Sequence, residues 1–367
     1  MLIFDAHLDM AWNAIEWNRD LMAPVSTIRE FEQNFQNIIP GECTVSWREL
    51  HQGHVGLTIS TLLPRLHRKD KPLTFYQSLE AAYGSAMGQL HYYKAMCAAG
   101  VLREISDKAV LDAHVAEWET YTRSRSVPNS DVPGQKGAPP IGYILSMEGS
   151  YPILSPGQIP EWYAAGLRIL GPAHYGPNPY CHGTGSEGGL REHGPALLKE
   201  MDQVGMLLDA THLADQSFWE ALEIFQGPVL ASHHNCRTLV NRDRQLSDDM
   251  IKALIQRGAV IGAAFDAWML TPGWTIGVTK PADTDCTLET VVDHIDHVCQ
   301  LAGNAKHAAL GTDLDGGFGK EQSPKDLETI SDLHRIAGIL EKRGYSPEDV
   351  EGVMYKNWVN FFRRAWA

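Results

Sequence analysis

The sequence of 367 residues contains no uninterrupted apolar run of the 18 or so residues that a membrane-spanning helix needs. It has no excess of basic residues either, because 31 Lys and Arg stand against 45 Asp and Glu, a formal net charge of −14. This charge repels phosphate backbones, and no Lys/Arg cluster with interleaved aromatic residues opposes it. We therefore expect a soluble protein that binds no nucleic acid.

Cysteine is scarce and scattered along the chain. The six cysteines form no CxxC pair and lack the density of a small disulfide scaffold, so we interpret them as mostly buried free thiols in a reducing compartment. The first residues, MLIFDAHLDM, show no basic region followed by an apolar stretch and a small-residue cleavage site, and hence no secretory signal. Both observations predict a cytoplasmic location.

What the sequence does contain is an alternation of short apolar runs with stretches of helical spacing, the pattern of repeated βα units. Eight runs are the number needed to close a (β/α)₈ barrel (TIM barrel), and an open doubly wound sheet is the alternative. The runs are Leu2–Phe4, Val55–Ser60, Ile141–Met147, Leu167–Leu170, Gly205–Asp209, Pro228–Ala231, Ala259–Ala264 and Ala308–Gly311.

Helical spacing of apolar residues predicts helices over Leu79–Ala99, Leu288–Ala302 and Pro347–Trp366. Segments rich in Pro and Gly predict loop insertions at about 124–140 and 171–195. Because no internal repeat and no linker divides the chain, we expect one domain over residues 1–367.

Side chains suited to metal binding or proton transfer follow the ends of six of these runs. In a parallel barrel the carboxyl ends of the strands share one face, and active sites of this fold are built there. The sequence therefore predicts one site from scattered motifs. The residues are Asp5, His7, Asp9, Glu148, His174, His212, His233, His234, Asp313 and Asp315.

Each of these residues has a structural alternative. His7 and Asp9 are two apart on an extended chain, so both can reach one cation, although an isolated HxD also arises by chance. Glu148 ends a largely apolar run and would be a costly buried charge unless a cation or a basic group met it. Its alternative is a loop carboxylate turned to solvent.

The later candidates carry similar alternatives. His212 and His233 each end an apolar run, where a hydrogen-bonded core histidine is the alternative to a ligand. Only one of His233 and His234 should face the interior; we favour His233, and strand parity leaves His234 open. Asp313 and Asp315 share a face of GTDLDGG, and for Asp315 we favour a turn or capping role.

The motifs, taken in order, resemble the membrane (renal) dipeptidase family, zinc peptidases built on a (β/α)₈ barrel. The resemblance covers nearly the whole chain. It rests on DAHLD near the start, MEG at Glu148, GLRILGPAH ending at His174, GMLLDATH ending at His212, PVLASHHNCR around His233, RQLSDDM from Arg244, and VDHIDHVCQLAG followed by GTDLDG.

The resemblance implies a metal centre with two Zn²⁺ per chain. His7 and Asp9 match the ligands of one zinc ion in the family, and His212 and His233 match the ligands of the second. Glu148 matches the carboxylate that bridges both ions, and we count it among the catalytic residues.

The resemblance also implies the residues that handle the substrate. His174 matches the histidine that contacts the scissile carbonyl, and Asp313 matches the aspartate near the bridging water and the substrate amine. Arg244 matches the arginine that receives the substrate carboxylate. Arg237 and Arg242 lie nearby, and a small gap would shift the match to one of them.

The activity implied is hydrolysis of dipeptides by a metallopeptidase, including dipeptides with a C-terminal D-amino acid. A metal-dependent N-acyl-amino-acid deacylase on the same scaffold is an alternative that would keep the metals and Arg244 without needing a free substrate amine. A third hypothesis, from a different functional class, is a metal-binding scaffold without catalytic activity.

The sequence departs from the family pattern in three places, the first being Leu8, which stands where the family commonly has Asn between the two ligands. The mammalian members carry a lipid anchor at the C-terminus, whereas NFFRRAWA offers no hydrophobic tail, so the chain resembles a bacterial-type, unanchored member. The segment AAFDAWML around Phe265 differs from the more polar, Tyr-containing family segment. We therefore expect Asp266 or Trp268 to reshape the pocket beside the substrate side chain. A homodimer is the family expectation.

Overall fold

The protein is a parallel (β/α)₈ barrel, seen in a computed structural model that describes residues 1–35, 41–65, 76–125, 131–135 and 137–367. Eight of its strands are hydrogen-bonded in chain order around the barrel, from β1 and β2 through β4 to β9. The strands are β1 (Ile3–Leu8), β2 (Val55–Leu62), β4 (Ile141–Glu148), β5 (Ile169–Gly171), β6 (Leu207–Asp209), β7 (Val229–Leu230), β8 (Ile261–Ala263) and β9 (Ala308–Leu310).

All eight predicted runs are strands, and the prediction of a barrel rather than an open sheet is confirmed. The sheet closes because β1 pairs with both β2 and β9, while a parallel bridge from Ala231 to Ile261 joins the β7 end to β8. One further strand, β3 (Leu102–Glu104), pairs with β4 beside the barrel. The sequence does not indicate β3, because its three residues, LRE, include one apolar residue and show no period.

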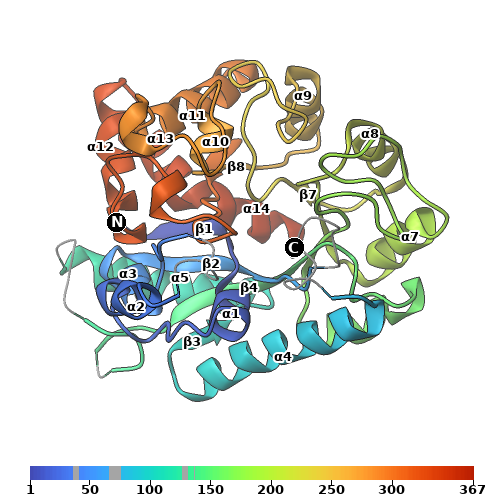
Figure 1. Cartoon of the computed structure of the whole chain (residues 1–367), viewed down its shortest axis with the longest axis horizontal. Helices are drawn as coiled ribbons and strands as arrows, with labels where there is room; N and C mark the ends of the chain where they lie inside the picture. Colours follow the sequence, from blue (N-terminus) through green and yellow to red (C-terminus); the bar gives the residue numbers. More distant parts are fainter. Residues whose placement is uncertain (36–40, 66–75, 126–130, 136) are drawn as a thin grey trace.

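Helices follow most of the strands and cover the barrel, with α4 on one side and α9 and α11 on the other (Figure 1). The α-helices are α1 (Met10–Glu16), α2 (Val25–Glu32), α3 (Trp47–Gln52), α4 (Leu79–Ala98), α5 (Lys108–Arg123), α6 (Ile159–Ala164), α7 (Gly194–Val204), α8 (Asp215–Ile224), α9 (Asp248–Gln256), α10 (Ala267–Leu270), α11 (Leu288–Ala302), α12 (Arg335–Lys342), α13 (Pro347–Glu351) and α14 (Asn357–Ala365). The 3₁₀ turns are η1 (Pro156–Gln158), η2 (Pro281–Asp283), η3 (Lys320–Gln322) and η4 (Ile330–His334), and η5 (Gly352–Lys356) is a π-helical turn.

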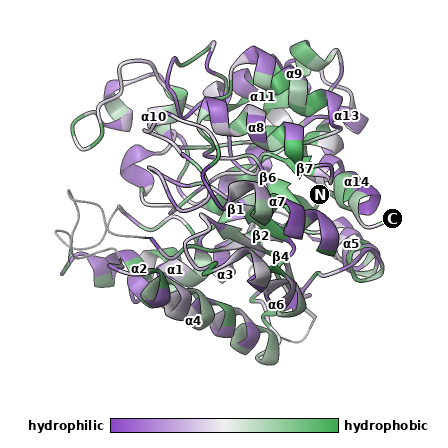
Figure 2. Cartoon of the chain, turned by 90° about the vertical axis from the view of Figure 1, so that its right-hand side faces the viewer, coloured by the Kyte–Doolittle hydropathy of each residue, from purple (hydrophilic) through white to green (hydrophobic). Residues whose placement is uncertain are grey.

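The core lies in and around the strands, where the hydrophobic residues concentrate (Figure 2). The C-terminal helix α14 packs on the core against both the first strand, β1, and the last strand, β9. Trp358 donates a 2.9 Å hydrogen bond to the Leu310 carbonyl oxygen at the end of β9, and Phe362 stacks on Phe4 of β1 with ring centroids 5.9 Å apart. These contacts hold β1 and β9 side by side, which matters because both strands carry candidate site residues at their carboxyl ends.

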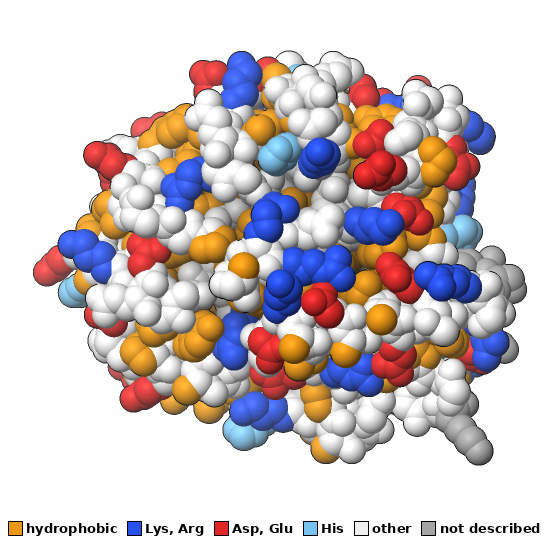
Figure 3. All heavy atoms as spheres, turned by 180° about the vertical axis from the view of Figure 1, so that it is seen from behind, with side chains coloured by type: hydrophobic (Ala, Val, Ile, Leu, Met, Phe, Trp, Pro, Cys, Tyr) orange, Lys and Arg blue, Asp and Glu red, His pale blue; other side chains and the backbone are white. Residues whose placement is uncertain are grey.

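The surface and the thiols agree with the composition. Basic and acidic side chains are interspersed on the face drawn in Figure 3, with no field of one sign. All six cysteines are free thiols, as predicted. Among the described residues, no helix combines the length and the apolar character needed to cross a membrane.

Of the two predicted insertions, residues 126–130 and 136 of the first lie outside the described residues. The second, 171–195, folds back on itself through isolated bridges such as Tyr175 to Thr184 and Cys181 to Leu190. It thereby brings Thr184 beside the predicted ligand His212. The organisation of residues 1–367 as one domain stays a prediction.

Candidate metal centre

The predicted ligands meet at the carboxyl ends of the barrel strands, and all five are buried. His7 lies near the end of β1 and Asp9 just beyond it, while Glu148 is the last residue of β4. His212 and His233 each stand three residues beyond the end of β6 and β7. The exposed fraction of these side chains runs from 1% to 7%.

Glu148 lies at the middle of the group, and its two oxygens face different partners. Oε1 is 3.0 Å from Nε2 of His212 and 3.3 Å from Nε2 of His233. Oε2 is 3.8 Å from Nε2 of His7, which in turn is 3.7 Å from the Asp9 carboxylate. One carboxylate thus joins two sets of ligand atoms, the arrangement of a bridging ligand.

The two histidines of the first set are held as neutral imidazoles. Burial lowers the pKa of His212 to about 4 and the pKa of His233 well below its usual range. Ser232 donates to the Asp209 carboxylate, so its hydroxyl accepts from Nδ1 of His233 at 2.9 Å. The Nε2 lone pair of His233 therefore points into the site, as a metal ligand requires.

His212 is oriented in the same way by the 171–195 insertion. The Thr184 hydroxyl contacts Nδ1 of His212 at 2.9 Å and the His212 carbonyl oxygen at 3.4 Å. A hydroxyl that donates to the carbonyl accepts from Nδ1–H, which leaves Nε2 bare. His212 also adopts a positive φ of 68°, and Asp313 one of 58°, conformations that non-glycine residues hold only where the surrounding structure imposes them.

The second set, His7 and Asp9 with the nearby Asp313, carries more negative than positive charge. Burial alone would lower the pKa of His7, but the Glu148 and Asp9 carboxylates together raise it to about 10. Burial, together with the carboxylates of Glu148 and Asp9, raises the pKa of Asp313 well above its usual range despite the attraction of His7. A buried group of this kind, with more carboxylates than cations, is stabilised by a bound metal ion.

The unsatisfied atoms are the ones that a metal would use. Among the described residues, Nε2 of His7, both carboxylate oxygens of Asp9 and Oε1 of Glu148 are buried without a hydrogen-bond partner. Buried polar atoms are almost always paired, so this local concentration calls for a ligand. Imidazole nitrogens and carboxylate oxygens are the donors of catalytic zinc sites, and the residues therefore fit the metal.

Two glycines make room for the chain beside His233. A side chain on Gly262 or on Gly311 would collide with the carbonyl oxygen of Ser232. The carbonyl lies between β8 and the end of β9 at this point, so the turn that carries His233 can approach both strands only because neither position has a Cβ.

The structure places Arg244, rather than Arg237 or Arg242, in the pocket beside the metal centre. Arg244 is buried, donates one 3.1 Å hydrogen bond to the His233 carbonyl oxygen and keeps Nη1 without a partner among the described residues. Arg237 pairs with both oxygens of Asp215, at 2.7 Å each, on the surface. Arg242 donates to backbone carbonyl oxygens of the α10 region.

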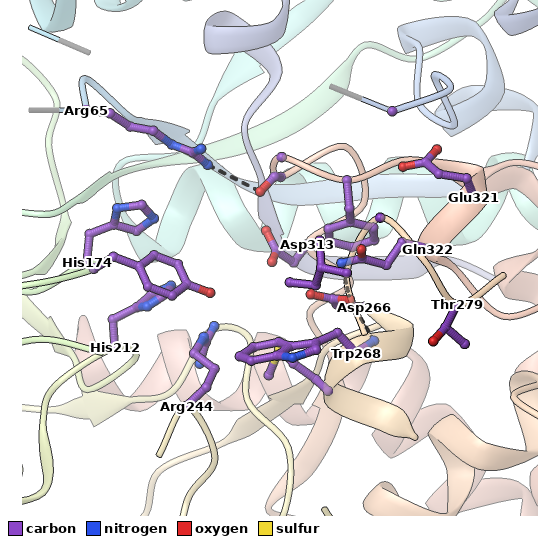
Figure 4. A pocket seen from close by; sticks show the side chains of 18 of the residues that line it. Arg65, His174, His212, Arg244, Asp266, Trp268, Thr279, Asp313, Glu321 and Gln322 are labelled. Atoms are coloured by element: carbon purple, nitrogen blue, oxygen red, sulfur yellow. Dashed lines mark hydrogen bonds between the residues drawn. The ribbon is translucent and has the colours of Figure 1, made fainter. Parts of the chain in front are cut away.

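The pocket has a volume of about 570 Å³ and opens over the metal centre. Figure 4 shows His174 and His212 on one side, Arg244 below and Asp313 near the middle. Burial lowers the pKa of His174 well below its usual range, so its ring is neutral, and its Nε2 lies 3.9 Å from Oε2 of Glu148. A volume of this size is typical of a small-ligand site.

Asp315 does not face this pocket. Its carboxylate accepts hydrogen bonds from Thr44 and Val45 and from the Arg19 guanidinium at 3.0 Å. Asn13 donates to the carbonyl oxygens of both Asp9 and Asp315, at 3.0 Å each. The hydrogen bonds of Asp315 therefore stabilise the turn behind Asp9, which agrees with the structural role favoured for Asp315.

Some pocket residues were not predicted. Arg65 follows β2, lies over the Trp12 ring at 4.4 Å and donates to the Gly316 carbonyl oxygen, while Tyr175 follows His174 directly. Gln322 reaches the pocket from the η3 turn, far along the chain. Arg65 and Tyr175 could have been predicted, because each lies a few residues after a predicted strand. Nothing in the sequence indicated Gln322.

Comparison with known families decides the affiliation of this site. Residues 1–366 match the family described as membrane dipeptidase, peptidase family M19. The chain belongs to this family. The resemblance that the motifs predicted is thereby confirmed over the whole chain.

Relatives of this M19 chain are known among curated proteins and solved structures. Dipeptidase verJ of Clonostachys rogersoniana is 29% identical over 59% of this chain and 53% of its own length, and an uncharacterized protein of Klebsiella pneumoniae from the pqqA 5′ region is 29% identical over 56% and 74%. The matches thus span about half to three quarters of these relatives. A metallo peptidase of Rhodobacter sphaeroides, solved with a phosphinate mimic of L-Ala-D-Ala, is 19% identical over 100% of this chain and 99% of its own, with a TM-score of 0.74, and shares the fold.

Proposed function

We propose that the chain is a dipeptidase that works with two zinc ions. His7 and Asp9 would hold one ion, His212 and His233 would hold the other, and Glu148 would be a ligand common to both. The observation that carries this proposal is the position of Glu148, whose Oε1 faces His212 and His233 while Oε2 faces His7. Membership of the M19 family supports the peptidase chemistry.

When bound, two such ions polarise a peptide carbonyl and lower the pKa of a shared water. The protein supplies the remaining steps. The neutral His174 ring donates from Nε2 to the carbonyl oxygen as negative charge develops there. Asp313 accepts a proton from the attacking water and delivers it to the departing nitrogen as the C–N bond breaks.

Arg244 limits the substrate to two residues. Its Nη1 has no hydrogen-bond partner among the described residues, the residue lines the pocket together with Glu148 and His212, and a guanidinium pairs well with a carboxylate. A carboxylate bound there belongs to the residue that follows the scissile bond, so a longer peptide has no place for its further residues. Dipeptides with a C-terminal D-amino acid belong to the proposed substrates, and a homodimer stays a prediction.

A hydrolysis panel on zinc-loaded protein tests this function. It contains Ala-Ala, Ala-D-Ala, Ala-Ala-Ala, Ala-Ala-amide and N-acetyl-alanine, each with and without a chelator. We expect chelator-sensitive cleavage of both dipeptides and at least tenfold slower cleavage of the tripeptide and the amide, because neither presents a carboxylate to Arg244.

The acetylated compound separates the alternatives. Cleavage of N-acetyl-alanine with both dipeptides untouched would replace the proposal with the deacylase. No turnover of any compound, with two ions bound, would favour a scaffold without catalysis.

A further inference from the structure

Asp266 is a buried carboxylate in the pocket that the proposed chemistry does not use. It follows β8 and caps α10, where its Oδ1 accepts hydrogen bonds from the Trp268 backbone N–H at 2.9 Å and from Gln322 at 2.8 Å. The residue is 8% exposed and lines the pocket. Figure 4 shows its carboxylate between Asp313 and Trp268.

The second oxygen of Asp266, Oδ2, accepts no hydrogen bond from the described residues. No Lys, Arg or His nitrogen among them lies within 4.0 Å of this carboxylate either. Burial raises the pKa of Asp266 to about 6, so the group is ionised at pH 8. The Arg244 and Arg242 guanidinium groups attract Asp266 only from beyond that distance. A buried anion with no cation in direct contact is costly, and such groups concentrate at binding sites.

The other carboxylates of the pocket are already engaged. Glu148 is a proposed metal ligand, and Asp313 is the proposed proton acceptor and donor beside the ions. Glu321 accepts from the Gly319 backbone N–H at 3.0 Å through Oε1 and from the Glu42 backbone N–H at 2.8 Å through Oε2. Asp266 is therefore the carboxylate among the described pocket residues that is left for a cationic ligand.

Asp266 lines the same pocket as Arg244, the residue proposed to bind the substrate carboxylate. The residues on both sides of Arg244 are tied to α10, because Arg242 donates to the Trp268 carbonyl oxygen at 2.9 Å and Gln245 donates to the Met269 carbonyl oxygen at 2.6 Å. The attraction of the Arg244 guanidinium acts on Asp266 through the pocket. One substrate residue with a carboxylate and a cation can therefore meet both groups.

We propose that Asp266 selects dipeptides whose C-terminal residue carries a cationic side chain, such as lysine or ornithine. This inference rests on the proposed dipeptidase function, since Arg244 must hold the α-carboxylate of the same residue. The side-chain ammonium then binds Oδ2 of Asp266 in a charge-assisted hydrogen bond.

The test compares kcat/KM at pH 8 for a series in which only the C-terminal side chain changes. Ala-Lys, Ala-Orn and alanyl-diaminobutyrate vary the reach of the ammonium; Ala-norleucine and alanyl-Nε-acetyl-lysine lack the charge. We expect the best diamino compound to exceed Ala-norleucine by roughly 10- to 100-fold, the range for a hydrogen bond to a charged partner. These comparisons need no variant.

Two variants identify the responsible carboxylate. Asp266→Asn keeps an oxygen for the α10 cap and removes the charge, and we expect the preference for the diamino compound to fall at least tenfold while Ala-norleucine changes less than twofold. Glu321→Gln removes a charge from the same pocket, and we expect it to leave the preference unchanged.

The outcomes are distinct. Cleavage of Ala-norleucine at least as fast as every diamino compound overturns the inference and leaves the dipeptidase standing. Faster cleavage of Lys-Ala than of Ala-Lys would show that the pocket prefers a cation on the N-terminal residue, and this result also overturns the inference. Failure to cleave any dipeptide refutes the proposed function itself.

Discussion

Replacement of Asp313 by asparagine is expected to lower kcat for a dipeptide by about 1,000-fold, within the range for a lost general acid and base. Asparagine is nearly the same size and keeps a carbonyl oxygen, but it cannot accept and deliver the proton. Asp313 lies beside the metal centre, with Oδ1 3.7 Å from Nε2 of His7. We expect the variant to keep both zinc ions.

Zinc content and turnover of the same Asp313→Asn preparation check this expectation. The measurement matters because His7, His233 and Asp313 also form a group that could hold an ion. Loss of an ion together with activity would assign Asp313 to the ligands. A kcat within tenfold of the unmodified enzyme would contradict its role in proton transfer.

Glu148→Gln is expected to lose at least one zinc ion and to lower activity by roughly 100-fold or more. Mutation of residues that only hydrogen-bond to metal ligands already lowers metal affinity or activity by about 10- to 100-fold, and Glu148 is itself a proposed ligand. The amide offers one oxygen where the carboxylate offers two. Its NH₂ group would face either the His212 and His233 nitrogens or His7, so one of the two sets loses its anionic ligand.

The matched control for Glu148→Gln is Glu321→Gln, which makes the same chemical change in the same pocket. Both oxygens of Glu321 accept from backbone N–H groups, and we expect this variant to bind two ions. Bound zinc measured after dialysis separates the pair. If Glu148→Gln retains two ions, the proposal that the Glu148 carboxylate bridges them is wrong.

The meeting of the candidate ligands at one place could be predicted because parallel strands bring distant motifs to one face. The apolar runs before His7, Glu148, His212 and His233 are strong signals, and the carboxyl ends of barrel strands meet whatever the sequence separation. Strand alternation indicated that only one of His233 and His234 faces the interior, but it left the choice between them open. In the structure His233 contacts Glu148 and His212, while His234 belongs to no such group of ligand atoms among the described residues.

Other features depend on three-dimensional packing that one sequence does not reveal. The choice among Arg237, Arg242 and Arg244 required seeing which guanidinium is already paired. The positive φ of His212 reflects tertiary constraint rather than a residue preference. The short strand β3 carries no periodic signal in three residues.

The claim that two ions drive dipeptide hydrolysis is tested most directly by titrating chelator-treated protein with zinc, with bound zinc and Ala-Ala hydrolysis measured on the same samples. We expect two ions per chain, no hydrolysis without metal, and a plateau of activity when the second ion is bound. Full hydrolysis by the metal-free protein, or a plateau at one ion with no binding of a second, would contradict it.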